Sequence, residues 1–186
     1  QVYTDEPAQT GPRRVTVRRA GELGVVGISY KSPAASHEDM AALNVLGGIL
    51  SSGKTSRFYR ALTDKNLTTS VSADAGLFHD PSLFQIYAYL APGAGHEQVE
   101  KILREEIARV AKDGVTDAEA AMAVRKISAN IAYARDGTAA VAASLNEWIA
   151  AGDWTLYSTY PGRVAKVTMS DVKRVAQKYL VEDQST

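Results

Sequence analysis

The order in which the hydrophobic period changes along the chain is the feature that most constrains its fold. Apolar and polar residues alternate in residues 13–19 and 25–33, as expected for two strands. From Ser36, the predicted N-cap, the period becomes helical. Alternation returns in residues 68–78 and 82–92, which flank the turn sequence His-Asp-Pro. The first half of the chain therefore predicts two pairs of strands separated by helix.

The segments between and after these strands carry helical patterns. Residues 54–65 predict a second helix, and residues 96–113 predict a strongly amphipathic one that Gly114 would end as a C-cap. Strands joined by hairpins, with helices grouped between and after them, are typical of the α+β class. We expect a mainly antiparallel sheet covered by helices on one side.

The C-terminal part of the chain is predicted to be helical throughout. Thr116 and Glu119 have the spacing of a capping box, which opens an alanine-rich helical region with an interruption at Gly137. Residues 160–167 and 169–180 predict the closing helices. The predicted element order is thus β-β-α-α-β-β-α-α-α.

Length and composition predict one domain. Residues 1–12 are expected to be a linker and residues 13–186 the domain. The chain has 21 basic and 21 acidic residues, which gives it no electrostatic preference for nucleic acid, and it has no cysteine for disulfides or thiolate metal sites. No apolar run approaches the roughly 18–20 residues of a membrane span, and the polar start differs from a signal peptide. A start in a linker without methionine indicates a piece of a longer protein.

Residues 48–55, Gly-Ile-Leu-Ser-Ser-Gly-Lys-Thr, match the phosphate-loop pattern G-x-x-x-x-G-K-[ST] at every fixed position. Such a loop needs a strand that delivers the glycines to the start of a helix, where backbone N–H groups bind phosphate. Here the preceding residues are predicted to be helical, and no predicted strand ends in an acidic residue suited to magnesium. We interpret the match as accidental and expect no nucleotide site.

The same stretch resembles the second-domain signature of the pitrilysin/insulinase family of zinc metallopeptidases. Residues 19–50 and 160–180 resemble the opening and closing segments of that domain, so the resemblance covers about residues 13–180. It implies the fold of mitochondrial-processing-peptidase-like metallohydrolase domains. The matching parts of the signature are Leu46-Gly47-Gly48, Ser51-Ser52-Gly53, Ser56-Arg57-Phe58-Tyr59 with Leu62, and Ser70-Val71.

The zinc motif of that family is missing. The family binds zinc through H-x-x-E-H on a helix, with a further glutamate downstream. The chain has three histidines, His37, His79 and His96, and none has another within four positions. The resemblance is therefore to the zinc-free, non-catalytic half. We expect no catalytic residue, metal ligand or cofactor in this chain, and the resemblance implies that zinc is held by a homologous half in the parent protein.

In many relatives the zinc-free half supplies an arginine and a tyrosine, seven residues apart, to the active site of the other half. The matching segment here is one residue shorter and has Thr63 and Thr69 near those places, which makes them the candidate substrate-facing residues. A threonine hydroxyl supplies neither the charge of arginine nor the reach of tyrosine. The resemblance also implies a last strand that completes the sheet, and the chain is expected to end at or before it.

Two groups of aromatic residues have a structural interpretation, and the first also has a functional one. Tyr87 and Tyr89 on the predicted strand 82–92 are most simply sheet-packing residues, although a peptide-binding cleft could use the same surface. Trp148 and Trp154 are predicted to be packing anchors.

Two functions remain open at this point. The first is the non-catalytic domain of a zinc metalloendopeptidase, which forms one wall of a clamshell chamber around an unfolded peptide. Its partners would be the peptide and a zinc-bearing homologous half-domain or subunit. The alternative is a catalytically inactive structural or assembly subunit of the same fold. The family suggests a bacterial periplasm or cell envelope, a location on which the chain itself is silent.

Overall fold

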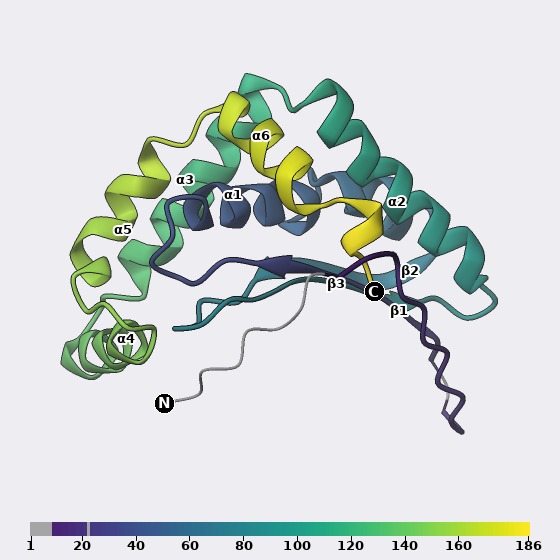
Figure 1. The fold of residues 1–186 in the computed structure, drawn as a ribbon, viewed down its shortest axis with the longest axis horizontal. Helices are drawn as coiled ribbons and strands as arrows, with labels where there is room; N and C mark the ends of the chain where they lie inside the picture. The colour runs from purple at the N-terminus through teal and green to yellow at the C-terminus, as the bar shows by residue number, and fades with distance from the viewer. Residues whose placement is uncertain (1–8, 22) are drawn as a thin grey trace.

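The computed structural model describes residues 9–21 and 23–186. In this part of the chain, three antiparallel strands form a sheet in the order β1–β3–β2 (Figure 1). Ile86 in the central strand lies opposite Ile28 on one side and Ala73 on the other. The predicted hairpin around residues 79–81 is confirmed, since β2 and β3 pair directly. The strands are β1 Val25–Ser32, β2 Thr68–Ala75 and β3 Ser82–Leu90.

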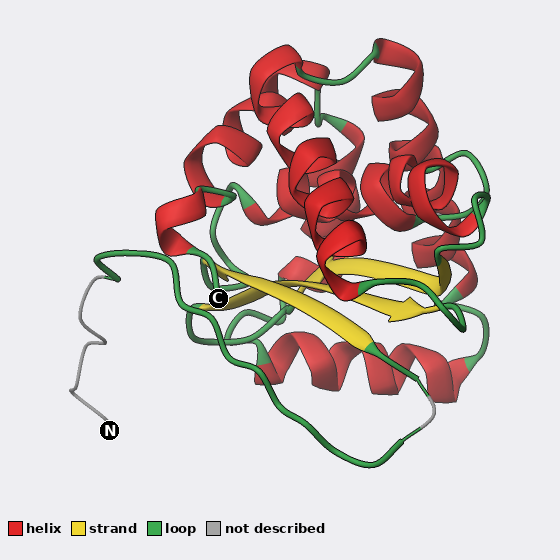
Figure 2. Ribbon diagram, turned by 90° about the vertical axis from the view of Figure 1, so that its right-hand side faces the viewer, coloured by secondary structure: helices red, strands yellow, loops and turns green. Residues whose placement is uncertain are grey.

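The helices cover one face of this sheet, as the sequence predicted (Figures 1 and 2). The helix α4 departs from this layer and lies beside one end of the sheet (Figure 1). None of the described helices combines the length and the apolarity that a membrane crossing requires. The α-helices are α1 Met40–Ser51, α2 His96–Asp113, α3 Asp117–Tyr133, α4 Thr138–Ala150, α5 Leu156–Ala165 and α6 Met169–Tyr179; a π-helical turn η1 spans Tyr59–Thr63, and a 3-10 turn η2 spans Glu182–Gln184.

The core lies between the sheet and the helices. Alternate residues of β1 and β3, among them Ile28, Tyr30, Phe84 and Ile86, point to the helices and are fully buried. Because side chains alternate along a strand, the residues between them point to the other face, which no described helix covers. The one-sided cover therefore creates two chemically different faces on a single sheet.

The predicted strand at residues 13–19 is wrong. This segment has no helix or strand, and Val15 and Val17 are 75% and 69% exposed. A strand needs a free edge to pair with, and the outer edge of β1 is occupied at Ser29, whose backbone exchanges N–H···O bonds of 2.9 and 3.0 Å with Thr186. In the predicted linker, residues 1–8 lie outside the described residues, and residues 9–12 carry no helix or strand.

Two predicted helix starts are also wrong. The helix α1 begins at Met40 with Asp39 in the N-cap position, because residues 35–39 form turns in which the Asp39 N–H donates to Nδ1 of His37 at 3.0 Å. Ser36 caps nothing. The helix expected from residue 54 is reduced to a short segment that ends in η1, since Gly53, with φ of 81°, turns the chain first.

Most of the later helix boundaries are confirmed, but the helix predicted at residues 160–167 is α5, which begins four residues earlier, at Leu156, and ends at Ala165. Thr116 and Glu119 form a full capping box, in which each side chain accepts a hydrogen bond from the backbone N–H of the other residue. Gly114 and Gly137 adopt φ of 82° and 90°, a region that favours glycine, and they end α2 and separate α3 from α4. A second capping box, of Thr168 and Asp171, begins α6.

A close contact between α1 and β2 explains part of the Leu-Gly-Gly sequence. A Cβ atom on Gly47 would lie 2.6 Å from the carbonyl oxygen of Ala73, so only glycine lets the two backbones approach this closely. One turn further on, the Ser51 hydroxyl donates to the Gly47 carbonyl at 3.1 Å and accepts from the Ala73 N–H at 3.0 Å. The serine thus satisfies a backbone donor on an edge strand of the sheet.

The start of α1 is fixed to α6 by a buried carboxylate. Asp39 is 1% exposed and accepts hydrogen bonds from Arg174 at 2.5 Å, Lys178 at 2.8 Å and the Tyr179 hydroxyl at 2.8 Å. Burial opposes ionisation of this carboxyl, but the hydrogen bonds from Lys178, Arg174 and Tyr179 outweigh it and lower the pKa of Asp39 to about 2. The first and last α-helices are therefore joined by charge as well as by packing.

Candidate functional site

The open face of the sheet is the first candidate site. We define it as the residues of the three strands that point away from the helices. Its centre is formed by two aromatic side chains of β3, Tyr87 and Tyr89, which are 38% and 44% exposed. Val25 and Ser70 lie on either side of Tyr89 in neighbouring strands. The other members of the face are Gly27, Ser29 and Lys31 in β1, Ser72 and Asp74 in β2, and Leu83 and Gln85 in β3.

Local contacts hold Tyr87 flat on this face. Its ring covers Gly27 in the adjacent strand, where a Cβ atom would meet the ring at 3.2 Å. The Gln85 amide donates to the Tyr87 hydroxyl at 3.1 Å. The surface is therefore a pleated layer of tyrosine rings and small hydroxyl side chains, suited to contact an extended chain.

The two threonines proposed as substrate-facing occupy different environments. Thr69 lies at the bulge where the register between β2 and β3 shifts, and its exposed hydroxyl donates to the Tyr89 carbonyl at 3.3 Å. Thr63 ends the turn η1, and its hydroxyl is 3.0 Å from that of Thr68, a buried residue. The two hydroxyls have different partners, so the structure does not join them into one catalytic pair.

The three histidines lie on separate elements. His37 lies in the turn before α1, and His79 contacts Asp80 in the hairpin at 3.0 Å. His96 begins α2, where its ring lies against Gly24. Among residues 9–21 and 23–186, no group of His, Cys, Asp and Glu side chains could hold a metal ion, so the residues present do not fit a zinc site.

The phosphate-loop match lies at the wrong end of a helix. Its first residues form the last turn of α1, where backbone carbonyls rather than N–H groups are left without helical partners. Lys126 of α3 donates to the Ser52 carbonyl at 2.8 Å and so caps this end with a cation. The negative end of a helix dipole does not attract phosphate, which agrees with the interpretation of the match as accidental.

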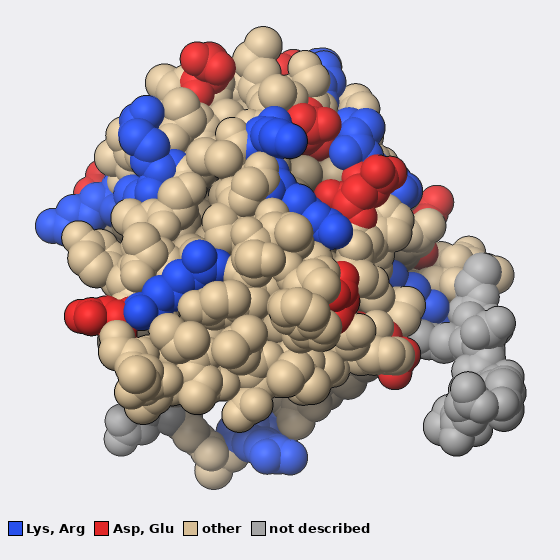
Figure 3. Space-filling view, turned by 90° about the vertical axis from the view of Figure 1, so that its left-hand side faces the viewer, with Lys and Arg blue, Asp and Glu red and all other residues tan. Residues whose placement is uncertain are grey.

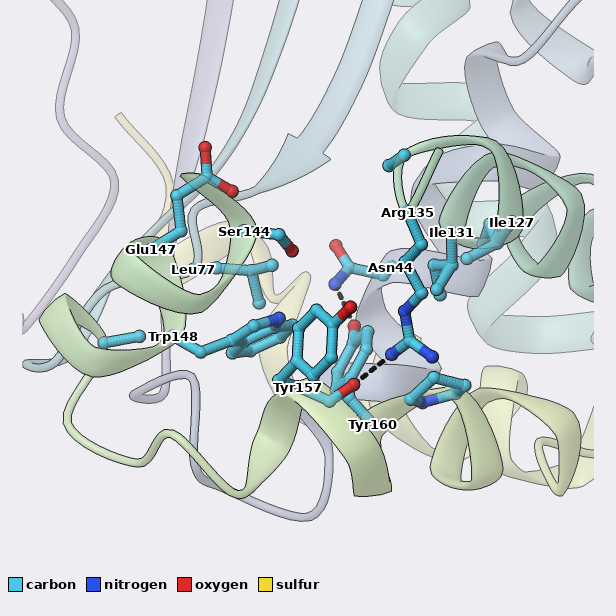
Figure 4. Close-up of a pocket in the computed structure, with 13 residues that line it drawn as sticks. Asn44, Leu77, Ile127, Ile131, Arg135, Ser144, Glu147, Trp148, Tyr157 and Tyr160 are labelled. Carbon is cyan, nitrogen blue, oxygen red and sulfur yellow. Dashed lines mark hydrogen bonds between the residues drawn. The ribbon is translucent and has the colours of Figure 1, made fainter. Parts of the chain in front are cut away.

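The structure also contains a cavity that the sequence did not reveal. It has a volume of about 490 Å³ and lies between α3, α4 and α5, with Asn44 of α1 at its wall (Figure 4). The Trp148 and Tyr160 rings pack with centroids 4.9 Å apart, as expected for Trp148 as an anchor. Trp154, by contrast, is 64% exposed, so its predicted packing role is wrong. The lining combines residues 127–161 of three consecutive helices and their connections with Asn44 and Leu77, which are distant in sequence, so no local motif marked the cavity.

Comparison with known proteins identifies the fold and the family. Residues 1–127 match the family model described as the Peptidase M16 inactive domain. The chain is 28% identical over 186 residues to the zinc protease PqqE of Helicobacter pylori, an alignment that covers 99% of this chain and 42% of that protein. The crystal structure of a protease from Helicobacter pylori superposes with a TM-score of 0.91 at 27% identity and covers 99% of this chain and 45% of that one. An inactive peptidase domain from Bordetella parapertussis superposes with a TM-score of 0.81 at 28% identity, over 92% of this chain and 94% of that one.

This chain is an α+β domain of the metallopeptidase type without metal ligands among its described residues. Because the family model matches more than half of its length, the chain belongs to the Peptidase M16 inactive domain family. The resemblance inferred from the sequence is thereby confirmed. The chain spans about two fifths of the length of the curated relative described above.

Proposed function

We propose that this chain is the non-catalytic domain of a zinc metalloendopeptidase and that its open face forms part of the wall of the peptide chamber. The observation that carries the proposal is the one-sided cover of the sheet, which leaves Tyr87 and Tyr89 on a broad uncovered surface. Support also comes from the relative named a zinc protease, which extends well beyond the part aligned with this chain.

In this proposal the chain contributes binding and exclusion of water rather than chemistry. A zinc-bearing homologous half, in the same protein or in a partner subunit, would supply the metal and the catalytic groups. An unfolded peptide would lie across the tyrosine rings, which offer apolar contact without demanding a particular sequence. Thr69 is the stronger of the two substrate-facing candidates because its hydroxyl is exposed, whereas the Thr63 hydroxyl already contacts Thr68.

The test compares the natural full-length protein with this 186-residue chain. Zinc content is measured by atomic absorption, and cleavage is measured with an unfolded peptide, with and without chelator. We expect zinc and chelator-sensitive cleavage in the full-length protein and neither in this chain alone. Stoichiometric zinc in this chain would contradict our account of its histidines, and zinc in neither protein would favour the structural or assembly role.

The open face is tested by replacing both tyrosines in the full-length protein. The double variant Tyr87→Ser and Tyr89→Ser should raise KM for the unfolded peptide by about tenfold, because two apolar contacts are lost, and should leave the zinc content unchanged. The matched control is Tyr133→Ser, since Tyr133 is 80% exposed at the end of α3 and outside the sheet. An equal change in KM in the control, or an unchanged KM in the double variant, would contradict the assignment of this face.

A further inference from the structure

The cavity between α3, α4 and α5 has the size and the wall of a ligand site. Its volume of about 490 Å³ falls within the range of roughly 300–1,000 Å³ that is usual for small-molecule pockets. Apolar and aromatic side chains make up most of the wall, and a few polar groups converge on it (Figure 4). The apolar and aromatic members are Leu77, Ile127, Ile131, Trp148, Tyr157 and Tyr160.

The position of α4 creates this space. Gly137 turns the chain sharply between α3 and α4, and none of the residues of α4 is buried, although most of them are apolar. The next helix, α5, in contrast buries Leu156, Tyr160 and Val164. The face of the molecule that carries α4 and α5 has a broad region without charged side chains (Figure 3). An apolar molecule can therefore approach the cavity without displacing ion pairs.

The guanidinium of Arg135 lies in the wall of the cavity. The Arg135 guanidinium is 4.3 Å from the centre of the Tyr157 ring and donates to the Tyr157 carbonyl. In the part of the chain that the structure describes, it forms no ion pair. An arginine has five N–H donors, so this single hydrogen bond leaves donors for a further acceptor. The ring and the carbonyl fix the guanidinium in place, which reduces the entropy lost on binding an anion.

The polar groups around Arg135 are compatible with an anion. Tyr160 accepts a hydrogen bond from the Asn44 amide, and burial raises the pKa of its phenol to about 12, so it stays neutral and does not repel an anion. Among the described residues that line the cavity, one side chain is acidic, Glu147, and it points away from the aromatic cluster (Figure 4). Ser144 on α4 adds a hydroxyl to the wall.

We propose that this cavity binds a molecule that joins a carboxylate to an aromatic or branched apolar body, with the carboxylate on Arg135 and the body between Trp148 and Tyr157. A guanidinium is a preferred donor to carboxylates, and the remaining wall is apolar. Two sources share this chemistry: a free apolar acid, and the C-terminal residue of a peptide. This proposal goes beyond the proposed function and requires neither zinc nor cleavage.

The test is a titration of the 186-residue chain with defined probes, followed by backbone amide NMR. N-acetyl-phenylalanine represents the free acid, and acetyl-Gly-Gly-Phe represents a peptide C-terminus; the carboxamide of each probe is its control. We expect the acids to shift the resonances of α3, α4 and α5 with a Kd on the order of 1 mM or tighter. The amides should bind about tenfold more weakly, because they lose a charge-assisted hydrogen bond. The tighter of the two acids identifies the source.

Variants separate the carboxylate contact from general packing. Arg135→Gln should weaken binding of the acids by about tenfold and abolish their preference over the amides. Arg125→Gln is the matched control, since Arg125 is an exposed residue of α3, the helix that ends two residues before Arg135, and does not line the cavity. Ser144→Phe should fill the cavity and prevent binding of acids and amides alike. Thermal unfolding verifies that each variant is folded.

The proposal is overturned by any of three results. The first is that neither acid binds at a concentration of about 10 mM, tenfold above the expected Kd. The second is that the natural sequence binds acid and amide with equal affinity. The third is that Arg135→Gln and Arg125→Gln lose the same amount of affinity. If Arg135→Gln fails to fold, the acid-to-amide comparison and Ser144→Phe still decide the question.

Discussion

Gly47 and Gly48 are adjacent in the sequence but have different surroundings. Gly47 contacts the backbone of β2, whereas a Cβ atom on Gly48 would meet Ala123 and Ile127 at ordinary distances of 3.6 and 3.7 Å. The requirement for glycine in this pair is therefore steric at the first position and absent at the second. No property of a Gly-Gly dipeptide in isolation distinguishes the two.

Replacing each of these glycines with alanine should consequently have different effects on stability. Gly47→Ala should reduce the free energy of unfolding by about 1–3 kcal/mol, because its Cβ atom would force α1 away from Ala73. Gly48→Ala should leave it unchanged or raise it by up to about 1 kcal/mol, because alanine favours the helix. Urea unfolding of both variants measures these changes. Equal destabilisation by the two variants would show that the close approach of α1 to β2 is not the cause.

Because of Asp39, the free energy of unfolding should fall as the solution becomes acidic. Its pKa of about 2 in the folded state is below that of an unfolded aspartate, so the stabilisation is complete above about pH 4 and is lost as the pH falls toward 2. At pH 7, Asp39→Asn should reduce the free energy of unfolding by about 2 kcal/mol or more, because a buried charge network is broken. The difference in the free energy of unfolding between the natural chain and the variant should become smaller from pH 4 to pH 3. A difference that stays constant over this range would assign the acid dependence to other carboxyls.

At the scale of elements, α3 and α6 begin with the same device in different surroundings. Both use a threonine N-cap and an acidic residue three positions on. Glu119 of α3 also binds Arg57 through two hydrogen bonds of 2.8 and 2.9 Å, and these bonds are the main reason why its pKa falls to about 2. Asp171 of α6 has a more distant partner, Arg174, at 3.7 Å. The first box therefore ties two segments together, whereas the second mainly caps the start of α6.

This difference predicts the cost of removing each acid. Thr116→Ala and Thr168→Ala should each reduce the free energy of unfolding by about 1 kcal/mol through loss of the cap. Glu119→Gln should cost about 1–3 kcal/mol more than Asp171→Asn, because the largely buried Arg57 would lose its charged partner. Urea unfolding at pH 7 compares the four variants. Similar costs for the two acids would mean that the Arg57 contact adds nothing to stability.

At the scale of the whole molecule, the helical layer makes the two faces of β3 unequal. Ile86 is fully buried under the helices, and Tyr89 is 44% exposed on the open face. Ile86→Ala should reduce the free energy of unfolding by about 2–5 kcal/mol. Tyr89→Ser should reduce it by less than about 1 kcal/mol, since the cross-strand contacts of Tyr89 are exposed to water. Thermal and urea unfolding test both values. A cost above 2 kcal/mol for Tyr89→Ser would indicate that the face is needed for folding rather than available for binding.

The sequence alone determined the elements whose information is local. The period of apolar residues gave β1, the β2–β3 hairpin and the amphipathic α2, and the capping box and glycine positions gave the boundaries of α3 and α4. The motif order led to the family, and the spacing of the three histidines excluded an H-x-x-E-H motif. Apart from the motif order, which extends over most of the chain, each of these inferences depends on residues within a few positions of one another.

The tertiary structure decided everything that depends on residues far apart in the chain. The alternation at residues 13–19 could not form a strand, because Thr186 pairs with β1 at Ser29. Asp39, which lies three residues after the predicted N-cap Ser36, is buried and hydrogen-bonded by Arg174, Lys178 and Tyr179. The cavity around Arg135 exists because α4 lies outside the helical layer. Edges, buried charges and cavities are properties of the assembled chain, since each requires partners that no local pattern specifies.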